Sequence, residues 1–135
     1  ITPSIRVGVY LSDKENVDVM MLGGRLVVKS LSVRDSYTRE GLKYVNCSKI
    51  FCSCDGLDVD AGVTTAFVEE AWITNEMMNT AAQVILLADS SKIGKSGYGK
   101  ICDLSRIDVL ITDAGIPQSV RERIEEEGVQ VLIAE

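Results

Sequence analysis

The stretch that decides the fold is Val84-Ile85-Leu86-Leu87-Ala88-Asp89-Ser90-Ser91-Lys92. Its first five residues are apolar, and such a run followed at once by polar residues is typical of a strand buried on both faces of a sheet. Comparable apolar, β-branched runs are Val17 to Leu22, Ile50 to Cys54, Val109 to Thr112 and Val129 to Ala134. We expect a strand in each of these segments.

Helical patterns separate these apolar runs. We expect helices over Ser4 to Ser12, Asp35 to Asn46 and Thr65 to Gln83, and a last helix with Pro117 in its first turn and Gly128 as its stop. Strands that alternate with helices predict an α/β fold in which a mostly parallel sheet carries helices on both faces. The Gly23-Gly24 pair is expected to form a turn that leads into a short strand.

Composition limits the function classes that fit the chain. Its 135 residues, 46% of them hydrophobic, are enough for one domain spanning residues 1–135. The net charge of -6 repels DNA phosphates and anionic lipid, so we expect this chain to bind neither DNA nor a membrane by itself. We find no apolar run as long as a membrane span and no secretory leader, and we expect a cytoplasmic protein.

Two residue types narrow the chemistry. Histidine is absent, which excludes a Ser-His-Asp or Cys-His nucleophile system and any metal site that uses imidazole. The cysteines are Cys47, Cys52, Cys54 and Cys102. Cys52 and Cys54 are separated by one residue in an apolar run, whereas structural zinc pairs are usually separated by two to four residues in a turn. We therefore expect buried cysteines that act as small hydrophobic residues, and neither a metal nor a cofactor.

Ligands of parallel sheets bind beyond the carboxyl ends of the strands. The loops that follow the apolar runs are Gly23-Gly24, Asp55-Gly56-Leu57-Asp58, Asp89-Ser90-Ser91-Lys92 and Asp113-Ala114-Gly115. Backbone amides of glycine-containing segments and the Lys92 ammonium suit a phosphate, while carboxylates accept hydrogen bonds from hydroxyls. Donors for a phosphate together with acceptors for hydroxyls predict a phosphorylated sugar as the ligand.

The predicted ligand contacts come from these loops and from the segment Ala61 to Thr65. They are Gly23, Gly24, Asp55, Gly56, Asp58, Gly62, Thr64 and Lys92. Thr64 or Thr65 is also expected to cap the helix that follows. Each residue has a simpler alternative role: a double glycine is often a plain turn, an Asp-Gly pair closes its own turn, and a loop lysine is often solvated.

The ordered series of motifs resembles the C-terminal effector domain of DeoR-type bacterial transcriptional regulators. The matching motifs are Leu22-Gly23-Gly24, the run from Cys54-Asp55-Gly56-Leu57-Asp58 to Thr65, Leu87-Ala88-Asp89-Ser90-Ser91-Lys92-Ile93-Gly94, and Ile107 to Asp113. The resemblance implies the fold of ribose-5-phosphate isomerase and a domain that senses a phosphorylated sugar. It also implies an N-terminal winged helix-turn-helix, absent from this chain, whose operator affinity the ligand changes, usually relieving repression.

The sequence departs from the family pattern at two places. Family members typically open this domain with a strand and a Gly-Thr-Thr-like phosphate loop, followed by a Thr-Asn-Ser segment. Ile1-Thr2-Pro3-Ser4 resembles that later segment with Pro3 in place of asparagine, so we expect the first strand and its phosphate loop to be missing. Val33 stands where relatives often have a glycine.

Two alternatives accompany the sensor hypothesis. A sugar-phosphate isomerase is favoured by the likeness of Asp55-Gly56-Leu57-Asp58 to an isomerase motif, but Ala61 to Thr64 lacks the lysine that would stabilise an enediolate. Glu69 or Glu70 would then be the base, although a helix glutamate is more often a solvated surface residue. An oligomerisation module is compatible with sensing, and we expect a homo-oligomer.

Overall fold

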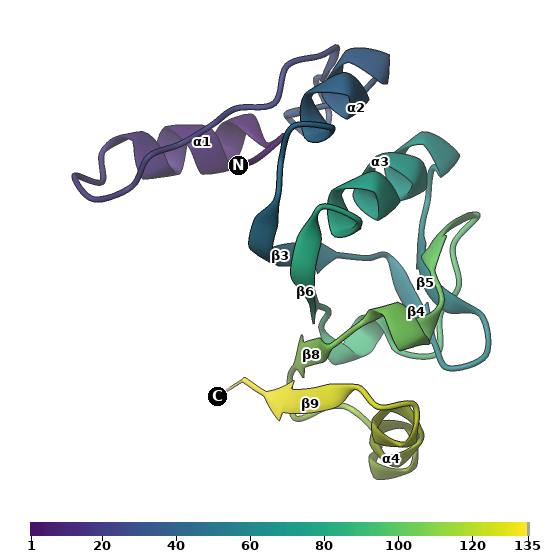
Figure 1. Ribbon diagram of the computed structural model, residues 1–135. Coiled ribbons are helices and arrows are strands. Elements are labelled where there is room, and N and C mark those ends of the chain that lie inside the picture. The colour runs from purple at the N-terminus through teal and green to yellow at the C-terminus, as the bar shows by residue number, and fades with distance from the viewer. Residues whose placement is uncertain (135) are drawn as a thin grey trace. The chain divides into compact units, whose positions relative to one another are not determined.

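The computed structural model describes residues 1–134, which form two compact units. The first unit is Ile1–Val45, and the second begins at Asn46. Each unit is described separately below, and Figure 1 labels the main elements of both.

The first unit consists of short elements. Its helices are α1 (Ile5–Ser12) and α2 (Ser36–Leu42), and its strands β1 (Leu26–Val27) and β2 (Ser32–Val33) pair antiparallel. The expected helix start at Ser4 is confirmed, since its side chain accepts a hydrogen bond from the Val7 amide. Asp35 caps α2 in the same way, but this helix ends at Leu42 rather than Asn46, because Lys43 and Val45 continue the chain in turns that bond to Glu40 and Leu42.

The strand predicted over Val17 to Leu22 is wrong. Within the described residues this segment has only one isolated bridge, in which Met21 pairs with Thr2 in parallel. A single bridge satisfies few backbone groups, and an apolar run forms a strand only where a neighbouring strand supplies a ladder of partners. Leu22 is nevertheless buried, at 5% exposure.

The second unit contains the expected parallel sheet. Its strands are β3 (Cys47–Ser53), β6 (Ala81–Leu87), β8 (Val109–Thr112) and β9 (Gln130–Ile133), arranged in the order β3-β6-β8-β9 with every pairing parallel. The α/β class and the mostly parallel sheet are thereby confirmed, and helices flank the sheet (Figure 1). Leu86, Leu110 and Val131 lie side by side across three strands and are almost fully buried, so they form the centre of the core.

A second, antiparallel sheet was not expected from the sequence. It has the order β4-β5-β7, with β4 at Gly56–Asp58, β5 at Gly62–Thr65 and β7 at Gly99–Cys102. The predicted helix from Thr65 to Gln83 is therefore wrong at both ends. Helix α3 covers only Val68–Met78, because Thr65 belongs to β5 and Ala81 begins β6.

The last helix, α4 (Gln118–Glu126), matches the sequence pattern closely. Pro117 is its N-cap rather than a first-turn residue. At the other end the Gly128 amide donates to the Glu125 carbonyl and the Val129 amide to the Ile124 carbonyl, which forms a Schellman motif. Gly128 has φ 89°, a conformation that glycine adopts without a steric penalty.

Candidate functional site

Three aspartates follow three neighbouring strands of the parallel sheet. Asp55 follows β3, Asp89 follows β6 and Asp113 follows β8. Because β3, β6 and β8 are adjacent and parallel, these residues lie at the same edge of the sheet. We call Asp55, Asp89, Lys92 and Asp113 the carboxyl-edge cluster.

Asp55 is held by the strand and loop that lead to α3. Its Oδ2 accepts hydrogen bonds from the Thr65 hydroxyl and the Ala66 amide, both at 2.8 Å. The Thr65 bond contributes most to holding the pKa of Asp55 below its ordinary value, and the positive charge of Lys92 adds to the same effect. Asp55 is therefore ionised at neutral pH, and its own side chain does not close the Asp55-Gly56 turn.

Asp89 caps the short 3-10 helix η1 (Ser90–Lys92), and its Oδ1 accepts a hydrogen bond from the Ser91 amide at 2.9 Å. Asp113 Oδ2 accepts one from the Ser90 amide at 2.6 Å. A hydrogen bond from the Ser91 side chain is the largest cause of the lowered pKa of Asp89, and the bond from the Ser90 amide is the largest cause of the lowered pKa of Asp113. Both side chains are therefore carboxylates at neutral pH.

The charges of the cluster influence one another. Lys92 favours the charged forms of Asp55 and Asp89, while Asp113 disfavours that of Asp89. The pKa of the nearby Cys54 thiol is raised to about 11, mainly by burial and then by the charges of Asp55 and Asp89, while the charge of Lys92 acts in the opposite direction. The structure thus brings together two predicted site residues, Asp55 and Lys92.

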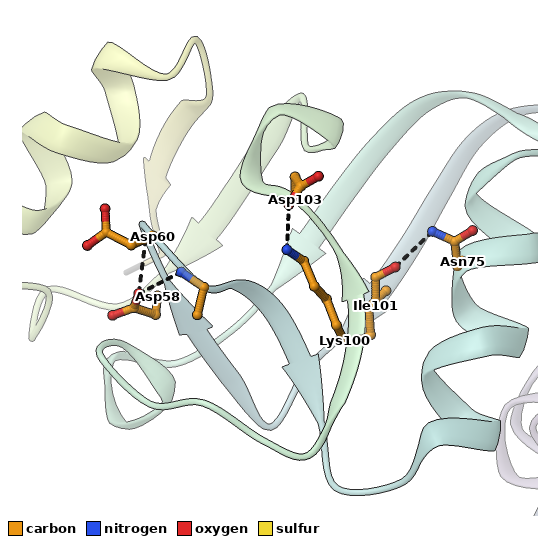
Figure 2. A network of polar contacts seen from close by, with 7 residues as sticks. Asp58, Asp60, Asn75, Lys100, Ile101 and Asp103 are labelled. Atoms are coloured by element: carbon orange, nitrogen blue, oxygen red, sulfur yellow. Dashed lines mark hydrogen bonds and ion pairs between the residues drawn. The ribbon is translucent and has the colours of Figure 1, made fainter.

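Four other predicted site residues belong to the antiparallel sheet. Asp58 Oδ1 accepts hydrogen bonds from the Asp60 and Ala61 amides, at 3.0 and 2.9 Å, and so closes the turn between β4 and β5 (Figure 2). Thr64 is buried, donates to the Gly56 carbonyl and accepts from the Gly97 amide at 2.7 Å. A side chain at Gly62 would collide with the Cys102 carbonyl. All four residues have roles in the folding of this sheet.

The expected cap of α3 is wrong. Thr64 and Thr65 lie in β5, and the N-cap residue is Phe67, whose backbone is extended. Ala66 and Phe67 connect the strand to the helix, so Thr65 is not the residue that caps α3. The Thr65 hydroxyl instead donates a hydrogen bond to Asp55.

Gly23 and Gly24 belong to the first unit, where they lie against the start of α2. The Thr38 hydroxyl donates to the Gly23 carbonyl at 2.8 Å, and the Asp35 carboxylate accepts from the Arg25 amide at 2.9 Å. Gly24 has φ 141°, and a side chain there would collide with the Thr38 hydroxyl. Their binding to an anion stays a prediction.

Asp89 and Asp113 lie in two of the predicted loops but are not among the predicted ligand contacts. The signal was present in the sequence, because an aspartate follows each of three successive apolar runs. Parallel strands that are neighbours in the sheet necessarily bring such residues to one edge.

The side chains offer little support for a metal site or for a reactive thiol. Among residues 1–134, no group of three or more cysteine, aspartate or glutamate side chains is arranged to hold a metal ion. The four cysteines are free thiols, and burial raises the pKa of Cys52 to about 12 and that of Cys102 to about 11. Cys54 and Cys102 are buried in the core, which confirms for them the expected role as small hydrophobic residues.

No helix in the described part of the chain has both the length and the apolar character that a membrane crossing requires.

Comparison with known proteins identifies the class. The family model described as the DeoR C terminal sensor domain matches residues 1–114. The chain therefore belongs to the DeoR family of transcriptional regulators, as the resemblance implied. The matched domain is a sensor domain and its relatives are named as regulators, so the domain is not an enzyme and the isomerase alternative is set aside.

Individual relatives agree with this assignment. The chain is 35% identical to the uncharacterized HTH-type transcriptional regulator YulB of Bacillus subtilis, over 97% of the chain and 51% of the relative. It is 32% identical to a putative aga operon transcriptional repressor of Escherichia coli O157:H7, over 98% and 49%, respectively. It is 33% identical to the HTH-type transcriptional repressor GlcR of Bacillus subtilis, over 100% and 52%. The chain thus spans about half the length of the curated relatives it matches.

Proposed function

We propose that this domain senses a phosphorylated sugar at the carboxyl edge of its parallel sheet, within a transcriptional regulator of carbohydrate metabolism. The observation that carries the proposal is the carboxyl-edge cluster, in which the Lys92 ammonium interacts with the Asp55 and Asp89 carboxylates and Asp89 interacts with Asp113. This position is where parallel α/β sheets bind ligands.

The two kinds of charge have different roles in the proposed complex. Lys92, half-buried at the end of η1, binds the phosphate as a compact positive charge. Asp55 accepts a sugar hydroxyl through Oδ1, since both of its protein donors use Oδ2. Asp89 accepts a second hydroxyl. Ionised carboxylates make charge-assisted hydrogen bonds to hydroxyls and repel a phosphate, so they also fix the orientation of the sugar.

The regulator acts by population shift. The phosphosugar binds one arrangement of the sensor domain, or of its homo-oligomer, better than another, and operator affinity changes only by that difference in binding free energy. The DNA contacts come from a helix-turn-helix domain outside this chain, and the protein acts in the cytoplasm. The names of the relatives include repressors, which favours relief of repression as the outcome.

Isothermal titration calorimetry tests the proposal with a panel of aldose, ketose, alditol and amino-sugar phosphates. The free sugars and inorganic phosphate serve as comparisons. We expect at least one phosphosugar to bind, and Lys92→Ala to weaken it by about tenfold or more, the size of one charge-assisted hydrogen bond. The matched control is Lys100→Ala, which removes an exposed lysine paired with Asp103.

Two results would contradict the proposal. One is the absence of heat or thermal stabilisation with every phosphosugar of the panel. The other is an equal loss of affinity in Lys92→Ala and Lys100→Ala, since a nonspecific loss of positive charge would explain it. Turnover of a bound sugar phosphate would instead revive the isomerase alternative.

A further inference from the structure

We propose that Asp113 is a positioning residue for ligand binding, and that it acts by fixing the turn that carries Lys92. The inference rests on the proposed function, because it assigns a role within that same site. Three observations support it, and they concern the start of η1, its end and the hydrogen bonds of Asp113 itself.

The start of η1 is tied to the loop after β8. Asp113 Oδ2 accepts the Ser90 amide at 2.6 Å, a short charge-assisted hydrogen bond. The two loops also pack tightly, because an added side chain at Gly115 would collide with the Ser90 hydroxyl and lie 2.8 Å from Asp113 Oδ1. The position of Ser90 therefore depends on Asp113.

The end of η1 is tied to the strand that follows Asp55. Ile93 forms a parallel bridge with Leu57 in β4, and the Gly94 amide donates to the Leu57 carbonyl at 2.8 Å. Lys92 thus lies between two fixed points, Ser90 and Ile93. Since β4 begins directly after Asp55, the same contacts also fix the position of Lys92 relative to Asp55.

Asp113 uses both carboxylate oxygens for its own loops. Oδ2 accepts from Ser90, and Oδ1 accepts from the Gly115 amide at 2.8 Å. Because both oxygens of Asp113 already accept backbone amides and its charge would repel a phosphate, we assign its effect on phosphosugar binding to the position of Lys92. This separates Asp113 from Asp55, which we assign to a direct contact.

A double-mutant cycle measures this dependence. The variants are Asp113→Asn, Lys92→Ala and the double variant, titrated with the tightest phosphosugar of the panel. We expect Asp113→Asn to weaken binding about fivefold in the wild-type background and less than about twofold in the Lys92→Ala background. A purely structural role would lower the melting temperature and weaken binding equally in both backgrounds. The control is Asp103→Asn, an exposed carboxylate, for which we expect no change.

A second variant covers the case in which Asp113→Asn fails to fold. Gly115→Ala keeps the carboxylate but displaces Ser90, and we expect it to show the same dependence on Lys92. If the wild type binds a phosphosugar but the losses of affinity are additive in both double-mutant cycles, the inference is overturned and the proposed function stands. Failure of the wild type to bind any phosphosugar would overturn both.

Discussion

The first unit, Ile1–Val45, and the second unit, which begins at Asn46, bury different kinds of side chain. In the first, the buried residues are Leu22, Val33, Thr38 and Leu42, and every residue of α1 is exposed or half-buried. The second has a continuous apolar core built on the parallel sheet. Burial of apolar surface is the dominant stabilising contribution to folding, so we expect the second unit to be the more stable one.

The first unit relies more on hydrogen bonds between side chains and backbone. Asp35 accepts from the Arg25, Tyr37 and Thr38 amides, and the Thr38 hydroxyl donates to the Gly23 carbonyl. We therefore expect core substitutions to destabilise the second unit most, and loop substitutions to destabilise the first unit most. Trp72, the one tryptophan of the chain, lies in α3 and reports on the second unit, while amide hydrogen exchange reports on each unit separately.

The largest effect is expected from truncation of the core. Leu110→Ala removes a fully buried side chain from β8 and should lower the free energy of unfolding by about 3 kcal/mol. The matched control is Leu132→Ala in β9, which is 43% exposed and should cost less than about 1 kcal/mol. Urea unfolding followed by Trp72 fluorescence measures both. Equal losses would show that the apolar core does not dominate the stability of this unit.

A matched pair of glycines separates close packing from backbone strain. Gly62 and Gly128 have nearly the same φ, 86° and 89°, but only at Gly62 would a side chain collide with another group, the Cys102 carbonyl. Gly128→Ala should therefore cost about 1 kcal/mol from the left-handed backbone alone, and Gly62→Ala about 3 kcal/mol. The same urea experiment compares them, and a smaller loss at Gly62 would contradict the close approach of β5 and β7.

Another glycine pair tests the loop of the first unit. Gly24→Ala should destabilise it by about 1 to 2 kcal/mol, because a side chain there lies against Asp35 and Thr38 in an unfavourable backbone conformation. Gly23→Ala should be nearly neutral, since its added carbon meets no atom within 4 Å. Exchange rates of the Tyr37 and Thr38 amides are the readout. Faster exchange in Gly23→Ala as well would mean that the loop tolerates neither change.

The parallel sheet could be predicted because each of its strands contains an apolar run. β8 coincides with the predicted segment, and β9 differs from it by one residue at each end. The antiparallel sheet could not, because Gly56–Asp58 and Gly62–Thr65 are short, contain small and polar residues, and read as loop sequence. Their strand conformation depends on pairing with β7, which lies far along the chain.

For the candidate site too, some features could be predicted from the sequence and others could not. Asp55 and Lys92 could be placed at one edge of the sheet because they follow recognisable parallel strands, and their contact with a ligand stays a prediction. The contact of Asp113 with the Ser90 amide could not be predicted, since it joins two loops that are distant in sequence. Gly62 and Thr64 were selected as ligand contacts, but they belong to a buried strand.

The smallest expected effect is the change of folding stability with pH, and it involves both units. The pKa values of Asp35, Asp55, Asp89 and Asp113 are lowered, mainly by hydrogen bonds that the carboxylates accept. A lowered pKa in the folded state means that the stabilisation is complete above the ordinary pKa, near pH 4, and is lost as the pH falls through the lowered value.

Urea midpoints should therefore be flat from about pH 8 to about pH 5 and fall below about pH 4. The absence of histidine leaves no imidazole to titrate in the flat range. Asp113→Asn should reduce the acid-dependent loss seen by Trp72 fluorescence, and Asp35→Asn the loss seen by exchange in α2, because each variant removes one carboxylate with a lowered pKa. Acid sensitivity that is unchanged in both variants would place the responsible carboxylates elsewhere in the chain, and would remove pH as a means of telling the two units apart.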